Sequence, residues 1–166
     1  MSEVARAVNA LFDKVWSAHG RIDSLVNSAG GQFPQAAIDF SVKGWNTVIN
    51  TNLNGSWYMM QAAAQHWRDH KHPGSIVNIV VVTTHGLYGI AHSVAARAGV
   101  IGLSRAVAVE WAPLNIRVNC VAPGAIDSVY CSWRSRAISA NTSRTVSVGP
   151  GKYAVPPVSR QSFLSN

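Results

Sequence analysis

An arginine without an acidic neighbour and a loop of small residues are the parts of this sequence best suited to chemistry. Arg97 is surrounded in the sequence by Ala and Gly, so its charge is more readily used on a ligand than in an ion pair. The loop Asn27–Gly31 lets a ligand approach the backbone closely, although the same residues suit an ordinary turn. Asn52, inside a helical pattern, either holds a water molecule or caps a helix bend. We favour a ligand contact for Asn27–Gly31 and Arg97.

Histidines offer a second kind of chemistry. His66 and His70 lie four residues apart on a predicted helix, as zinc ligands can. With His72 they are more typical of a solvated helix end. We therefore predict no metal site.

The candidate residues need a strand–helix–strand unit to position them, and one runs from Gly74 to Gly124. An apolar run at 75–82 predicts a strand, 91–112 predicts a helix rich in Ala, Gly and Val, and 115–122 predicts a second strand. Such a unit implies a parallel sheet. Ligands bind outside the carboxyl ends of parallel strands, so the chemistry is expected at 81–84 and 122–126.

Two helices and a strand are predicted before this unit. Residues 2–19 form a helical pattern that ends at Gly20, and 22–26 form a short strand. The helix pattern from 44 to 70 contains Gly55, which indicates a bend or close packing. The expected apolar face of the first helix consists of Val4, Val8, Leu11, Val15 and Trp16.

Composition divides the chain at Ile126. With 48% apolar residues the chain can fold, and its two cysteines, Cys120 and Cys131, indicate a reducing compartment such as the cytoplasm. Residues 127–166 hold five basic residues against one acid and nine serines, with no sustained strand or helix pattern, so we expect a loose tail. Nucleic-acid binding by this tail is a weaker alternative, because no aromatic-basic stripe accompanies the charge. No apolar run is long enough to span a membrane.

Four motifs make residues Val4–Ile126 resemble the short-chain dehydrogenases/reductases. Leu25–Gly30 resembles the family's Asn-Asn-Ala-Gly motif, and Asn52–Gly55 resembles its Asn-x-x-Gly helix motif. The other two are the strand Gly74–Ile79 and the Arg-Val-Asn-x-Val-x-Pro-Gly block at Ile116–Gly124. Two further segments, Gly30–Phe33 and His92–Val100, are most similar to the peroxisomal trans-2-enoyl-CoA reductase branch, although no C-terminal peroxisomal signal is present.

The resemblance implies an α/β fold: a partial Rossmann-like doubly wound parallel sheet without the first βαβ unit and the last strand. It implies NADP, or alternatively NAD, and an acyl-CoA-like substrate. It also implies a homo-oligomer formed through the helices at 44–70 and 91–112. The catalytic residues that it implies are Asn52, Ser93, Arg97 and Tyr88, and the cofactor-binding ones are Asn27, Ala29, Gly30, Arg97, Pro123, Gly124 and Ile126.

The sequence departs from the family at the catalytic set. Val81 stands where the family has serine, and Ser93 and Arg97 stand where it has tyrosine and lysine. Loss of the tyrosine suits an enoyl reduction better than a ketone reduction, because hydride then goes to carbon and the carbonyl oxygen needs only a donor to hold enolate charge. The candidate donors are Tyr88, His92, Ser93 and Thr84.

The sequence contains no Gly-x-x-x-Gly-x-Gly turn for a pyrophosphate. We therefore expect a truncated form that binds cofactor weakly or not at all. The alternative from another class is a non-catalytic remnant or oligomerisation module that retains the helix-pairing surface.

Overall fold

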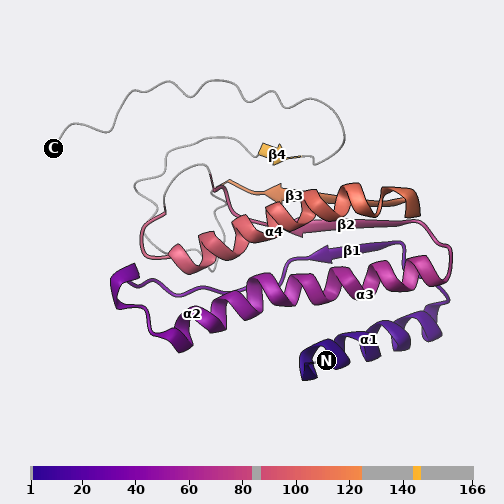
Figure 1. Cartoon of the computed structure of the whole chain (residues 1–166), viewed down its shortest axis with the longest axis horizontal. Coiled ribbons are helices and arrows are strands. Elements are labelled where there is room, and N and C mark those ends of the chain that lie inside the picture. The colour runs from indigo at the N-terminus through magenta and orange to yellow at the C-terminus, as the bar shows by residue number, and fades with distance from the viewer. Residues whose placement is uncertain (1, 84–86, 125–143, 147–166) are drawn as a thin grey trace.

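A mostly parallel sheet with helices along it forms the molecule (Figure 1). The computed structural model describes residues 2–83, 87–124 and 144–146. The strands β1 (Ser24–Asn27), β2 (Gly74–Ile79) and β3 (Ile116–Ala122) run parallel in that order. The short β4 (Arg144–Val146) pairs antiparallel with β3. The predicted partial Rossmann-like sheet is thus confirmed.

Four α-helices accompany the strands. They are α1 (Glu3–His19), α2 (Val42–Ile49), α3 (Gly55–Asp69) and α4 (Ala91–Glu110). Short 3-10 turns occupy Ala37–Asp39 and Ala112–Leu114. No helix of the described residues is long and apolar enough to cross a membrane.

The first helix forms as predicted, but it packs through a different set of residues. Ser2 caps α1 by accepting the Ala5 N–H at 3.2 Å, and Gly20 ends the helix in a left-handed conformation. Phe12 is the buried residue, whereas Val4 and Leu11 are 57% and 48% exposed. The predicted apolar face is therefore only partly correct, because α1 packs mainly on α3.

The predicted helix over 44–70 is interrupted by a π-helical turn. α2 begins at Val42, and the turn Asn50–Asn54 joins it to α3 without a break in the helical path. The Gly55 N–H donates to the Asn50 carbonyl, one residue beyond the α-helical spacing. The bend expected near Gly55 is thus a π turn, a feature that often marks functional sites.

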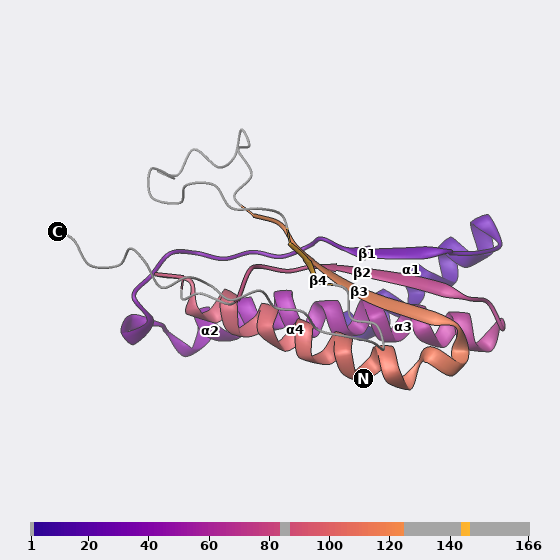
Figure 2. The same cartoon turned by 90° about the horizontal axis from the view of Figure 1, so that it is seen from above.

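The helices α2, α3 and α4 lie on one side of the sheet (Figure 2). The core between them and the strands includes Trp67, Met60, Ile76 and Val118, each at most 1% exposed. A Cβ on Gly74 would overlap the Trp67 ring, so this glycine allows the indole to lie directly on β2.

The strand β4 lies in the segment where no strand pattern was predicted, so that prediction is wrong for Arg144–Val146. Side-chain periodicity gave no signal, but the edge of β3 offers backbone groups that pair with any extended segment. The other residues of the predicted loose tail lie outside the described part of the chain.

Candidate functional site

A pocket of about 220 Å³ opens at the carboxyl ends of β1 and β2. It is lined by Gly30 and Gly31 after β1, by Ile79 at the end of β2 and the two residues after it, and by Ser93 and Arg97 from α4. This is the sheet end at which a ligand was predicted, because parallel strands bring their carboxyl ends together. Val81, at the position of the family serine, is among the lining residues and offers no hydrogen bond from its side chain.

Arg97 supplies the positive charge of the pocket. Its Nη1 donates to the Ile79 carbonyl at 2.6 Å, which holds the guanidinium against the end of β2. Burial lowers the pKa of Arg97, but an arginine remains charged in proteins. Within the described residues, no carboxylate forms an ion pair with it. A half-buried charge with no counter-ion is costly, so the pocket favours a ligand rich in acceptor oxygens.

The absence of a side chain at Gly30 leaves room for the Arg97 guanidinium. A Cβ at Gly30 would collide with Nη2 of Arg97 and would lie 2.9 Å from Oδ1 of Asn52. A larger residue here would therefore displace the guanidinium, and residues 28–31 of the loop are left exposed beside the pocket.

Asn52 holds the same loop from the π turn. Its Oδ1 accepts the Gly31 N–H and its Nδ2 donates to the Gly31 carbonyl, both at 2.9 Å. The residue is fully buried, so its amide is engaged with protein. The two predicted alternatives, holding a water molecule or capping a helix bend, did not include this contact with Gly31. Asn52 positions the glycine loop.

Asn27 also points into the protein. Its Nδ2 donates to Oδ1 of Asn78 at 2.8 Å, and Nδ2 of Asn78 donates to Oγ of Ser104 at 2.9 Å and contacts Sδ of Met60 at 3.1 Å. These groups link β1, β2, α3 and α4 beneath the site. The structure thus turns the Asn27 side chain inward, while the adjacent Ala29 is exposed.

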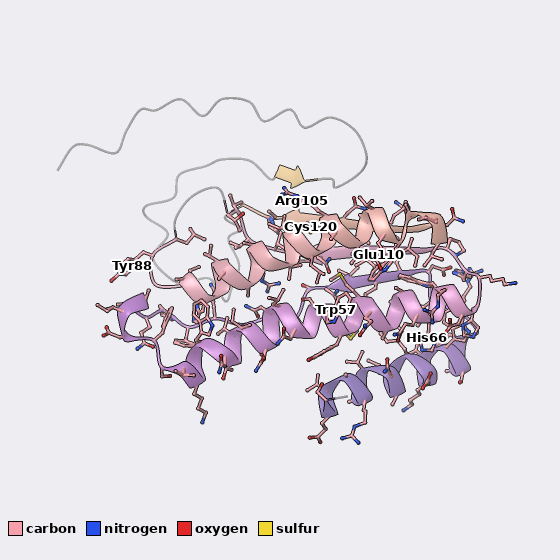
Figure 3. All side chains as sticks on the ribbon, in the orientation of Figure 1. Trp57, His66, Tyr88, Arg105, Glu110 and Cys120 are labelled. Carbon is pink, nitrogen blue, oxygen red and sulfur yellow. The ribbon has the colours of Figure 1, made fainter. Side chains whose placement is uncertain are left out.

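The candidate proton or hydrogen-bond donors lie in different environments. Ser93 lines the pocket although only 3% of it is exposed. His92 is fully buried, with Nδ1 accepting the Ser93 N–H at 2.8 Å. Tyr88 is 95% exposed and points away from the helices in Figure 3, so it is not brought to the pocket. Thr84 lies outside the described residues.

His92 packs against the loop at 32–41, a contact that was not predicted from the sequence. Its ring stacks on Phe40 at a centroid distance of 4.4 Å and meets Phe33 edge-on at 4.6 Å. In the described part of the chain its Nε2 has no hydrogen-bond partner. The sequence signal for this packing was the pair of aromatic residues, Phe33 and Phe40, in an otherwise irregular loop.

The remaining predicted cofactor residues follow β3. Pro123 and Gly124 are partly exposed there, and neither lines the pocket of Arg97. Ile126 lies outside the described residues.

The histidines of α3 pack on α1. Nε2 of His66 lies 3.3 Å from a carboxylate oxygen of Asp13, and its ring stacks on Trp16. The His70 ring meets Trp16 in a tilted arrangement at a centroid distance of 4.2 Å. Figure 3 shows His66 between the two helices. Within the described residues, no group of three His, Cys, Asp or Glu could hold a metal ion. His70 is exposed, as expected for a solvated helix end, and its ring also contacts Trp16 of α1.

Comparison with known proteins gives a consistent match. The family described as Enoyl-(Acyl carrier protein) reductase matches residues 3–147. A Bacillus subtilis protein named "Probable 2,4-dienoyl-CoA reductase" is 42% identical over 123 residues, which cover 73% of this chain and 48% of that protein. A 3-oxoacyl-acyl-carrier-protein reductase from Thermotoga maritima is 38% identical over 122 residues. These residues cover 73% of this chain and 49% of that protein.

Solved structures share the fold. A short chain dehydrogenase from Bacillus anthracis has a TM-score of 0.72 at 39% identity, over 76% of this chain and 52% of that one. A structure titled "ElxO with NADP Bound" has a TM-score of 0.71 at 32% identity, over 78% and 53%. The chain thus spans about half the length of the relatives that it matches.

The ordered motifs, the parallel sheet with its site at the strand ends, and the family match over residues 3–147 lead to one conclusion. The chain belongs to the short-chain dehydrogenase/reductase family of oxidoreductases.

Proposed function

We propose that this chain takes part in the NADP(H)-dependent reduction of 2-enoyl thioesters of the acyl-CoA type. The observation that carries the proposal is the pocket in which Arg97, without an acidic partner among the described residues, lies beside Ser93 and against Gly30. Relatives named for a dienoyl-CoA reductase and an acyl-carrier-protein reductase support a thioester substrate. NAD is the alternative cofactor, and a reducing compartment such as the cytoplasm fits the buried free Cys120.

The residues present fit part of a nicotinamide cofactor. The exposed backbone of the loop before Gly31 can lie against a ribose, and the Arg97 guanidinium can donate to its hydroxyl groups. When bound, the nicotinamide supplies a hydride. Asn52 holds Gly31 in place, which fixes the loop on which that contact depends.

Ser93 is our choice for the group that contacts the substrate. Its hydroxyl can donate to the thioester carbonyl, where negative charge grows as the double bond is reduced. Arg97, on the same face of α4, adds a positive charge near that oxygen. In contrast to Ser93, Tyr88 would need to move from its exposed position to reach a substrate.

The test follows NADPH absorbance with crotonyl-CoA and with acetoacetyl-CoA, at protein concentrations high enough to offset weak binding. We expect oxidation with the enoyl substrate, and its loss in Arg97→Gln. Preference for the 3-oxo substrate would favour ketone reduction instead. Absence of any NADPH oxidation with crotonyl-CoA would contradict the proposal for this chain.

Two neighbouring glycines provide a matched pair of variants. Gly30→Ala displaces the Arg97 guanidinium, whereas a Cβ at Gly31 meets nothing within 4 Å. We expect Gly30→Ala to weaken NADPH binding by roughly tenfold, equivalent to about 1.4 kcal/mol, and Gly31→Ala to leave it nearly unchanged. Equal losses in both variants would mean that the contact between Gly30 and Arg97 does not shape the cofactor site.

A homo-oligomer through α3 and α4 is a second, compatible proposal. Val109 on α4 is 77% exposed, so it is available for packing against a second copy. Sedimentation of wild type and Val109→Lys tests this role. A monomeric wild-type chain would contradict it.

A further inference from the structure

A buried histidine lies next to the pocket without lining it. His92 is fully buried, whereas Ser93, the next residue of α4, lines the pocket. The His92 ring packs on two aromatic rings, with centroid distances of 4.4 Å to Phe40 and 4.6 Å to Phe33. A side chain enclosed in this way does not reach a ligand in the pocket, so it can influence the chemistry only through its neighbours.

The two nitrogen atoms of the His92 ring have different surroundings. Nδ1 accepts the Ser93 N–H at 2.8 Å, so Nε2 carries the hydrogen in the neutral ring. Nε2 is buried and has no hydrogen-bond partner among the described residues. A buried donor without a partner is costly, and a phenylalanine would retain the ring contacts without that cost. The ring contacts therefore do not explain why this position holds a histidine, whereas the acceptor at Nδ1 does.

This acceptor supplies what the start of α4 lacks. The first N–H groups of a helix have no partner within the helix, and a side chain at the N-cap commonly accepts one of them. The N-cap residue of α4 is Ile90, whose side chain cannot accept a hydrogen bond. The Ser93 N–H lies 2.9 Å from the Ile90 carbonyl oxygen and shares its hydrogen between that oxygen and Nδ1 of His92. Two acceptors thus hold the backbone of Ser93.

The same ring connects α4 with the loop at 32–41, which carries both aromatic residues. The Gln35 N–H of this loop donates to the Gly89 carbonyl, just before α4, at 2.9 Å. The loop continues directly from Gly31, which lines the pocket. His92 therefore joins two segments that border the pocket, and it affects how they lie relative to each other.

We propose that His92 is a positioning residue for the reduction, because its Nδ1 holds Ser93 where the serine hydroxyl meets the thioester carbonyl. This inference rests on the proposed function, in which the hydroxyl donates to the carbonyl oxygen as negative charge grows there. A small displacement of such a donor lowers the rate steeply, since the donor stabilises the transition state only from the right place. Loss of the Nδ1 acceptor should therefore lower kcat and leave NADPH binding unchanged.

Two substitutions separate the acceptor from the ring. His92→Phe retains the aromatic contacts with the loop, and it removes both the Nδ1 acceptor and the unpartnered Nε2–H. His92→Asn removes the ring but retains an acceptor atom bonded to Cγ, as Nδ1 is. We expect His92→Phe to unfold at the same urea concentration as wild type or a higher one, and His92→Asn at a lower one.

Activity is expected to follow the opposite order. With crotonyl-CoA, under conditions in which circular dichroism shows each variant folded, we expect His92→Phe to lower kcat by about tenfold or more at an unchanged KM for NADPH. His92→Asn should retain more of the wild-type kcat. Wild-type kcat in His92→Phe would overturn the proposal, as would a kcat that falls in parallel with stability in the two variants.

The matched control is His70→Phe, which should leave kcat unchanged. His70 lies just before β2 begins, at the end of the sheet away from the pocket, and its ring also packs on an aromatic residue, Trp16. A tenfold loss of kcat in His70→Phe would show that the effect of the substitution is not specific to the contact with Ser93, and it would overturn the proposal.

A measurement without substrate separates this inference from the proposed function. Nitrogen-15 NMR of the histidine side chains identifies which ring nitrogen carries the hydrogen, and we expect Nε2 for His92. A hydrogen on Nδ1, in the neutral or the charged ring, would overturn the positioning role because Nδ1 could not then accept the Ser93 N–H. The Nε2–H form in a wild-type chain that does not oxidise NADPH with crotonyl-CoA would contradict the proposed reaction and support the positioning of Ser93 by His92.

Discussion

The two faces of the sheet are made by alternate residues of the same strands, yet they differ in almost every physical respect. On the helix side, Asn27 and Asn78 are buried and joined by a hydrogen bond, and the neighbouring Cys120 is buried so deeply that the pKa of its thiol is raised. On the other side, Val26 and Asn119 remain exposed or partly exposed. The helix side therefore carries the stability of the described fold, and the described residues leave the other side uncovered.

The largest expected effect comes from the centre of the covered face. Trp67→Ala removes a side chain that is 1% exposed and whose indole N–H donates to the Ile22 carbonyl at 2.6 Å. We expect a loss of about 3–5 kcal/mol in the free energy of unfolding, measured by urea denaturation. Trp45→Ala, at a residue that is 38% exposed, is the control and should cost far less. Similar losses for both would show that the core is not where the structure places it.

A smaller effect is expected from the buried polar network. Asn78→Ala leaves the Asn27 amide and the Ser104 hydroxyl without a partner on β2, so we expect a loss of about 2 kcal/mol. Asn119→Ala changes the same residue type on the open face of the next strand and should cost less than about 0.5 kcal/mol. If Asn78→Ala and Asn119→Ala unfold at the same urea concentration, the two faces do not differ in stability as the structure indicates.

The smallest effect is expected at the open face itself. Val26→Thr preserves the branched shape and adds only a hydroxyl group that water can solvate. We expect the free energy of unfolding to stay within about 0.5 kcal/mol of wild type. A loss above 2 kcal/mol would mean that Val26 is covered in the isolated chain, and it would contradict the difference between the two faces.

Local patterns were sufficient to predict most of the fold. Apolar periodicity predicted α1, β2, α4 and β3, and the Asn52–Gly55 motif marked the interruption between α2 and α3. The pocket opens at the end of the sheet where a ligand site was predicted, because strand direction alone decides that location. Arg97 and Ser93 were therefore expected where the structure has them, on one side of one pocket.

What could not be predicted depends on contacts between distant residues. The bonds from Asn52 to Gly31 and from Asn27 to Asn78 span 21 and 51 positions, and no local pattern indicates which of several buried partners an amide will choose. The stacking of His92 on Phe40 and the exposure of Tyr88 likewise depend on how the 32–43 loop lies against α4. A short motif specifies the backbone that it forms, and tertiary packing decides which of its side chains face a ligand.

The central claim is that the Arg97 guanidinium binds the cofactor at the carboxyl ends of β1 and β2. NMR of the arginine side-chain N–H groups during a titration with NADPH, at millimolar concentration to allow for weak binding, tests it directly. We predict that the Arg97 signal shifts and saturates, while the signal of Arg117, exposed on the opposite face, does not move. An Arg97 signal that stays unchanged while other residues report NADPH binding would contradict the claim.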